Sequence, residues 1–347
     1  MMFGIIWLLT LSYAAFGSVL QDRKIPMFAT KLKGKDLVTY INKNQKLFTA
    51  DFSRRTPDSR FMSLKFLQLK SDIPRAEEIP YDGPIPERFD AREKWPHCKS
   101  IQQVRDQTKP CASCWAVSAA SVMSDRACIQ SGGKIQTLIS DSDLLSCCGG
   151  GNEVCGNCYD GGYPMKAWEH AIVNGTCSGG PYGAQNACKP YPFFPCGHHK
   201  GQRYYGECPP YGYETPKCRY ECQSGYPRRY NQDKIFAKSA YYVKDTVKAI
   251  QKEIMLNGPV QACFELYDDF RKYKSGIYKH FGGEKKGGHA VKLIGWGVEQ
   301  IDNQKVPYWI ASNSENYDWG ENGFFRIIRG ENHCLIETNV IAGFMKV

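Results

Sequence analysis

The chain has 347 residues, of which 42% are hydrophobic, so it is long enough and apolar enough to bury a sizeable core. This composition excludes a disordered or fibrous protein. The net charge of +10 is spread over the sequence and not gathered in one basic run, which argues against a nucleic-acid partner. The 16 cysteines are too many for a reducing cytosol unless they bind metal, so the compartment is the first question.

The N-terminus answers that question. An apolar run from Phe3 to Leu11 leads into small residues from Ala14 to Ser18, which predicts a signal peptide over residues 1–18, although no basic stretch precedes it. The run is shorter than the ~20 apolar residues that span a bilayer, and no later segment is long enough either. We therefore expect a protein without a membrane span, secreted or held in a lysosomal or endosomal vesicle, with most cysteines in disulfides.

Residues 19–84 form a polar, lysine-rich block without cysteine. Leu37, Tyr40, Ile41 and Leu47 recur at helical spacing, and the block ends in the proline-bounded turn IPYDGPIP. A cysteine-free block before a cysteine-rich one predicts a propeptide, followed by a mature domain over residues 85–347.

The mature domain changes character along its length. One helix is predicted to begin near Ser113, because Trp115, Val122 and Ile129 lie on one face. From about residue 235 onward, GHAVKLIGWGV, PYWIASNS and NGFFRIIRG are short apolar runs between turns, which predicts strands. The fold class is therefore α+β, with a helical lobe, a mostly β lobe and a cleft between them.

Cys114, in PCASCWAVSAA, has three possible roles. A zinc site would use the two C-x-x-C pairs Cys111/Cys114 and Cys155/Cys158, and a redox site would need a thioredoxin-like context that is absent. A nucleophile at a helix start would have its thiolate stabilised by free backbone N–H groups and the helix dipole. It would need a base and an orienting group, and the second half offers His289 and Asn313.

The motifs around these residues resemble the papain-like cysteine proteases, and within them the cathepsin B-like enzymes. The resemblance runs from about Ile85 to the end of the chain, through FDAREKWPHC, SDLLSCCG, GGYPMKAW, TPKC, NGPV, YKSGIY, GGHA, GWGVE, DWGENGFF and RGENHC. It implies a papain-like two-lobed fold with a helical left lobe and a β-barrel-like right lobe, the active-site cleft between them, and a propeptide in front.

The resemblance also implies the site. Cys114 is the nucleophile, His289 the proton donor to the leaving amine and Asn313 the residue that orients the imidazole. The side-chain amide of Gln107 and the Cys114 N–H form the oxyanion hole. The substrate-binding residues implied along the cleft are Gly161, Gly162 and Trp319.

An occluding loop over about residues 188–222 is a further implication. PYPFFPCGHHKGQRYYGECPP matches it, with His198 and His199 at the tip binding the carboxylate at a substrate's C-terminus. That arrangement implies peptidyl-dipeptidase activity beside endopeptidase activity. The pairs expected to latch the loop are Asp106 with His198 and Arg203 with Asp318.

Disulfide pairing is likewise implied by the resemblance: Cys98–Cys128, Cys111–Cys158, Cys147–Cys218, Cys148–Cys155, Cys188–Cys222 and Cys196–Cys208. Cys114 must stay free, Cys334 is expected to be free, and Cys177 and Cys263 have no assigned partner. Asn174-Gly175-Thr176 is a sequon for N-glycosylation.

Four departures from the family pattern stand out. QTKPCASC inserts a residue between Gln107 and Cys111, which could displace the oxyanion-hole amide, and CYDGGY carries a similar insertion. Glu315 stands where the family has a tryptophan that covers the Asn313–His289 hydrogen bond. We expect this bond to be exposed, and the carboxylate to leave the His289 pKa raised or little changed. Asn339 replaces a glutamate at the base of the S2 subsite, which disfavours arginine at P2.

The predicted function is a cysteine protease made as a zymogen, acting on proteins and peptides as a monomer without metal or organic cofactor. Its own propeptide inhibits it, cystatin-like proteins are possible inhibitors, and acid releases the prosegment. Apart from Glu315, YWIASNSENYDWGE resembles a motif of haemoglobin-degrading enzymes of blood-feeding worms. The alternatives are a weakened paralogue that binds peptides or inhibitors, and a disulfide-rich binding module.

Overall fold

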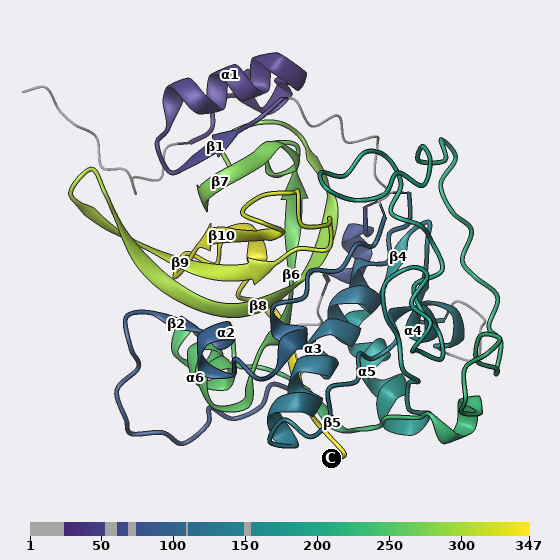
Figure 1. Ribbon diagram of the computed structural model, residues 1–347. Helices are drawn as coiled ribbons and strands as arrows, with labels where there is room; N and C mark the ends of the chain where they lie inside the picture. The colour runs from purple at the N-terminus through teal and green to yellow at the C-terminus, as the bar shows by residue number, and fades with distance from the viewer. Residues whose placement is uncertain (1–23, 53–60, 69–73, 109, 149–153) are drawn as a thin grey trace, which may run out of the picture.

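A long central helix and a curved sheet lie side by side in the computed structural model, which describes residues 24–52, 61–68, 74–108, 110–148 and 154–347. Figure 1 shows the helical lobe around α3 and the sheet lobe around β8 and β9. The predicted signal peptide lies outside the described residues. Within the described ranges, no helix is long and apolar enough to cross a membrane.

The helical lobe is built around α3, which begins one residue after the predicted start. All residues from Cys114 to Cys128 are buried, because α4 and α5 cover one side of α3 and β8 of the sheet lobe covers another. The α-helices are α1 Gly34–Asn44, α2 Ala91–Lys94, α3 Cys114–Gln130, α4 Asp141–Cys147, α5 Pro164–Val173 and α6 Val247–Asn257.

The sheet lobe contains the predicted strands. Its order is β1-β7-β10-β9-β8-β6-β11-β5, with β2 beside β8, and the described strands form an open sheet, not a closed barrel. The strands of this sheet are β1 Phe48–Ala50, β2 Phe89–Asp90, β5 Ala237–Tyr242, β6 Val260–Tyr267, β7 Tyr273–Tyr278, β8 Lys285–Ile301, β9 Gln304–Ser312, β10 Phe324–Ile328 and β11 Asn339–Met345. A separate two-stranded sheet beside α3 and α4 pairs β3 Gly156–Asn157 with β4 Gly161–Gly162.

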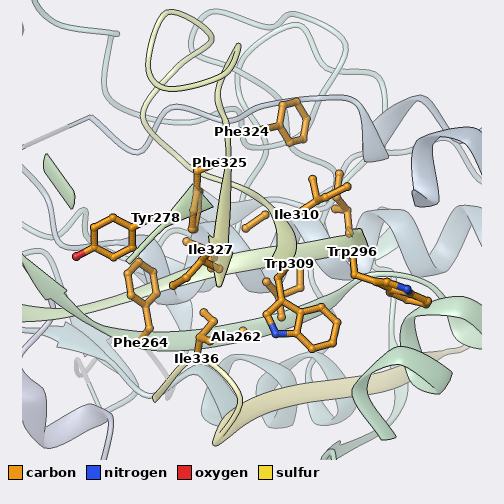
Figure 2. Close-up of a cluster of buried hydrophobic side chains, with 14 of the residues drawn as sticks. Ala262, Phe264, Tyr278, Trp296, Trp309, Ile310, Phe324, Phe325, Ile327 and Ile336 are labelled. Atoms are coloured by element: carbon orange, nitrogen blue, oxygen red, sulfur yellow. The ribbon is translucent and has the colours of Figure 1, made fainter. Parts of the chain in front are cut away.

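The core of the sheet lobe is aromatic. Phe264 of β6, Trp309 of β9 and Phe325 of β10 project into one buried cluster, which Figure 2 shows. Alternating inward side chains of this kind hold the register of antiparallel strands, because a slip by one residue would turn them to solvent. This register fixes the position of His289 in the first part of β8 and of Asn313 directly after the end of β9.

A buried arginine joins the two lobes. Arg126 of α3 is fully buried, and its guanidinium donates to the carbonyls of Pro259, Gly258 and Gly343 and to the Glu253 carboxylate at 2.7–2.9 Å. Four acceptors arranged around one planar donor group fix how α3 faces α6 and β11.

The N-terminal segment packs on the sheet lobe. α1 lies above β7, and β1 pairs antiparallel with β7 (Figure 1). The expected helical run extends to Leu47, but α1 ends at Asn44. The Gln45 side chain accepts from the Leu47 and Phe48 N–H groups and donates to the Ile41 and Phe48 carbonyls, which turns the chain from helix to strand.

The structure contains the six disulfides that the resemblance implied, each joining the same two cysteines. Cys114, Cys177, Cys263 and Cys334 are free. The Cys177 sulfur lies within 4.8 Å of the Cys188 sulfur, which is itself bonded to Cys222.

Candidate active site

Cys114 is the first residue of α3 and faces β8 across the junction of the lobes. Its sulfur accepts a hydrogen bond from the Ala290 N–H, which places the thiol beside the residue that follows His289. The side chain is 1% exposed, and this burial raises its pKa to about 12. The expected stabilisation of a thiolate at the helix start is therefore outweighed by desolvation in this form.

His289 and Asn313 are brought together by the pairing of β8 with β9. The His289 Nε2 lies 2.8 Å from the Asn313 Oδ1. Since an amide oxygen only accepts, Nε2 carries the proton, and Nδ1 of the neutral ring is left without one. Burial lowers the His289 pKa to about 4, although the Asn313 hydrogen bond acts in the opposite direction.

Gln107 is held by a residue that the sequence reasoning missed. The Ser314 hydroxyl donates to its Oε1 at 2.5 Å, and the Ser314 carbonyl accepts from its backbone N–H at 2.9 Å. Its Nε2 donates to the Cys111 carbonyl at 3.1 Å. Thr108, in the lengthened loop, has a φ of +55°, so the insertion is absorbed there while the glutamine stays buried. The position of Ser314 beside Asn313 was the one available signal.

Residues 61–67 of the N-terminal segment, which we call the plug, lie in the cleft. The Gly288 N–H donates to the Met62 carbonyl at 2.6 Å, and the Ser63 N–H donates to the Asp160 carbonyl at 2.7 Å. Gly161 has a φ of +89°, and a Cβ on it would come within 2.5 Å of the Met62 side chain. Only glycine permits this approach of the plug, and the substrate-binding role of Gly161 stays a prediction.

Gly162 packs against the helical lobe. It pairs with Gly156 in the two-stranded sheet of β3 and β4, and a Cβ there would meet the indole of Trp115 at 2.6 Å. Its lack of a side chain therefore serves packing against α3.

Trp319 and Glu315 flank His289 on the other side of the cleft. Together with Phe61 of the plug and Arg271 they line a small cavity that reaches His289 and Asn313. Trp319 is buried against Tyr273, with ring centroids 5.4 Å apart.

The expectation of an exposed His289–Asn313 bond is wrong for this form, because both residues are at most 5% exposed. The expected direction of the His289 pKa is also wrong, since burial and not a neighbouring charge is its largest cause.

The occluding loop departs from expectation at its tip. His199, not His198, meets Asp106: its Nε2 lies 3.7 Å from the carboxylate, and its Nδ1 lies 3.0 Å from Asp318. His198 is exposed and stacks on Tyr204, with ring centroids 4.4 Å apart. The expected latch between Asp106 and His198 is therefore wrong.

The second expected latch is wrong as well. Arg203 lies 5.4 Å from the centroid of the Tyr205 ring, and Asp318 is met by His199. One imidazole thus stands between both carboxylates. Two neighbours add to the closure, since the Asn316 amide donates to Asp106 at 2.9 Å and accepts from Gln202 at 2.6 Å.

Asn339 begins β11 directly opposite Cys263 of β6, and Cys263 in turn pairs with Ala290 of β8. Asn339 is 3% exposed, and its Oδ1 accepts no described hydrogen bond. Cys263, which the sequence reasoning left unassigned, therefore lies one strand from the residue that contacts the Cys114 sulfur.

Asn174 is exposed at the end of α5, where a glycan has room.

The zinc interpretation is excluded. Of its four sulfur ligands, those of Cys111, Cys155 and Cys158 are in disulfides, which leaves Cys114 alone.

Comparison with known proteins now decides the family. Residues 85–344 match the model of the papain family of cysteine proteases. The chain belongs to this family. Cathepsin B-like cysteine proteinase 6 of Caenorhabditis elegans is 45% identical over 341 residues, which cover 94% of this chain and 87% of the relative. The gut-specific cysteine proteinase of the same nematode is 45% identical over 320 residues, covering 91% and 92%.

A solved papain-family precursor extends the likeness to the N-terminal segment. Procathepsin B S9 from Trypanosoma congolense superposes with a TM-score of 0.73 at 32% identity, covering 91% of this chain and 99% of that one. The chain is therefore a cathepsin B-like cysteine protease with a papain-like α+β fold, and its structure is that of a zymogen.

Proposed function

We propose that Cys114, His289 and Asn313 hydrolyse peptide bonds. The observation that carries the proposal is the position of the Cys114 thiol at the start of α3. Its sulfur accepts a hydrogen bond from the Ala290 N–H, next to His289, and the Nε2 of His289 is hydrogen-bonded to Asn313. The Cys114 thiolate attacks the scissile carbonyl carbon, and the imidazolium gives its proton to the leaving amine. Water then releases the acid from the acyl-enzyme and restores the thiol.

Gln107 stabilises the oxyanion in this proposal. One of its two amide protons is engaged by the Cys111 carbonyl, so the other is free to join the Cys114 N–H. One such donor is typically worth about 3 kcal/mol in the transition state. Ser314 fixes the rotation of the amide.

The N-terminal segment inhibits the enzyme. In the described form the thiol and the imidazole are both held neutral by burial, with pKa values of about 12 and about 4. The order of these values disfavours the ion pair on which the mechanism depends. Removal of the plug rehydrates both groups. We propose residues 1–18 as signal peptide, 19–84 as propeptide and 85–347 as the mature enzyme.

The occluding loop confers peptidyl-dipeptidase activity. His199 closes the loop against Asp106 and Asp318, while His198 at the exposed tip is free to meet a substrate's C-terminal carboxylate. His199→Ala should lower release of C-terminal dipeptides and raise cleavage of long substrates, with His198→Ala lowering only the first. An unchanged ratio in both variants would contradict the assignment.

The substrate class is protein taken in as food, haemoglobin among its candidates. The support is the likeness to a gut-specific nematode proteinase and the motif around Asn313. Acting as a monomer in a vesicle or outside the cell, the enzyme would also meet cystatin-like inhibitors, and Asn174 would carry a glycan.

The test is hydrolysis of a Phe-Arg fluorogenic peptide between pH 4 and 8 after the prosegment is removed. Cys114→Ala is the blank. Turnover that disappears in this variant supports the proposal. A folded protein whose Cys114 reacts with an epoxide inhibitor but shows no turnover supports the second candidate, a peptide- or inhibitor-binding paralogue. The specific observation that favours that candidate is Glu315 in the cavity beside His289.

A further inference from the structure

A second part of the N-terminal segment makes contacts of its own with the sheet lobe. Residues 74–79, which we call the strap, run along β5, the last strand of the sheet order. Arg75 forms a parallel bridge with Tyr242, and the Ala76 N–H donates to the Tyr242 carbonyl at 2.8 Å. The outer edge of a sheet presents unpaired backbone groups, which an extended peptide satisfies by adding a strand.

The first side-chain contact of the strap is made by the guanidinium of Arg75. Arg75 Nη1 donates to the Val243 carbonyl at 3.1 Å and to the Thr338 carbonyl at 2.8 Å, and Nη2 lies 3.7 Å from the Asp245 carboxylate. These acceptors come from two separate segments of the sheet lobe. A planar group with several fixed N–H donors meets them, whereas the point charge of a lysine ammonium does not.

The second side-chain contact joins the carboxylate of Glu78 to the ammonium of Lys252. The Lys252 Nζ lies 2.8 Å from the Glu78 carboxylate and 3.1 Å from the Ile79 carbonyl. The Lys252 side chain is only 6% exposed, and among the described residues both contacts come from the strap. A nearly buried ammonium without partners is costly, so a vacated edge favours a new carboxylate at the same place.

We propose that this edge of β5 is a docking site for an extended peptide with arginine and, three residues later, glutamate, and that its occupant is the released strap. The proposal rests on the proposed function in one respect, because cleavage before Ile85 is what frees the strap. Since no contact of the strap described above involves the plug, the bound peptide leaves Cys114 open. The site can thus hold a product of maturation without inhibiting the enzyme.

The probe is a fluorescein-labelled synthetic peptide of residues 74–84, PRAEEIPYDGP. The full chain is matured by itself or by added protease and then blocked at Cys114 with an epoxide inhibitor, which prevents digestion of the probe and closes the cleft to it. Fluorescence anisotropy should show saturable binding. Peptides with Arg75→Ala or Glu78→Gln should bind at least about tenfold more weakly, because each loses a hydrogen bond to or from a charged group.

Glu77→Gln is the matched control peptide, because Glu77 is exposed beside Glu78 and should tolerate the change. In the enzyme, Lys252→Met should abolish the difference in affinity between the unchanged peptide and the Glu78→Gln peptide. Equal binding of all peptides, absence of saturation, or a matured enzyme whose mass still includes residues 74–84 would each overturn the proposal. Epoxide labelling and reporter turnover test Cys114 separately, so either proposal can fail alone.

Discussion

Met62 offers the sharpest test of the proposal that the plug inhibits the enzyme. Its side chain is fully buried between Gly161 and Gly288, on which a Cβ would meet it at 2.5 and 3.2 Å. Opening the plug exposes this side chain to water. Truncating a buried methionine to alanine costs about 2–5 kcal/mol, so Met62→Ala should increase the opened population by about 30-fold to a few thousandfold.

Alkylation of Cys114 by iodoacetamide at pH 7 measures that population. With the thiol pKa near 12, about one closed molecule in 10⁵ carries a thiolate, against about 3% for an ordinary cysteine of pKa 8.5. The closed form is therefore about 3,000-fold less reactive from ionisation alone, and labelling proceeds through opened molecules. Met62→Ala should accelerate it at least about 30-fold in the intact precursor.

Two controls make the result decisive. Met27→Ala alters a methionine of the same segment that is 77% exposed, and it should leave the labelling rate unchanged. Cys114→Ala gives the background from the other free cysteines. A Met62→Ala precursor that labels at the wild-type rate, or a Met27→Ala precursor that labels equally fast, would refute the plug as the source of the raised pKa.

Four further outcomes are expected. Burial lowers the His289 pKa to about 4, so between that value and about pH 6.5 the closed form binds fewer protons than an opened one. The contribution of His289 to the stability of the closed form is complete above pH 6.5 and is lost as the pH falls. Added protease should therefore trim a catalytically inactive precursor faster at pH 4.5 than at pH 6.5, and this difference should disappear when His289 is replaced by glutamine. Glu315→Trp should raise turnover of a peptide reporter. Unchanged kinetics would show that glutamate in place of tryptophan at this position does not weaken catalysis. Asn339→Glu should increase cleavage of an Arg-Arg reporter relative to a Phe-Arg one; a constant ratio would place the S2 base elsewhere. Arg126→Met should lower the free energy of unfolding by about 3–5 kcal/mol, because it strands a buried carboxylate, whereas Arg88→Met on the surface should cost under about 1 kcal/mol in a denaturant titration.

The elements with long or clearly bounded apolar stretches were predictable, and irregular segments were not. α3 was predicted from apolar residues at helical spacing, and β8 to β10 were predicted from short apolar runs between turns. These stretches are apolar because the structure buries them. His198 and His199 are adjacent in an irregular loop, and no periodic pattern in the sequence indicates which of the two contacts Asp106 and Asp318. The choice follows from the Tyr204 ring and from two carboxylates distant in sequence.

The site shows the same division. Cys114, His289 and Asn313 were found through motif and order, and the structure brings them together. Their protonation was not predictable, because the pKa of each depends on burial in the folded chain. Nothing in the sequence around Cys114 indicates that Met62 belongs to the same buried cluster.

Cys177 has a consequence for how the protein must be handled. Its sulfur lies within 4.8 Å of Cys188, so Cys188 has two candidate partners during oxidative refolding, Cys177 and Cys222. Attack by the Cys177 thiolate on this disulfide would expel Cys222 without any outside oxidant. In the folded chain, burial raises the pKa of the Cys177 thiol well above its usual range, so the exchange belongs to refolding, before Cys177 is buried. A thiol reductant added to keep Cys114 reduced promotes this exchange during refolding. Preparations that differ in redox history can therefore differ in the anchoring of the occluding loop while having identical mass and intact catalytic residues.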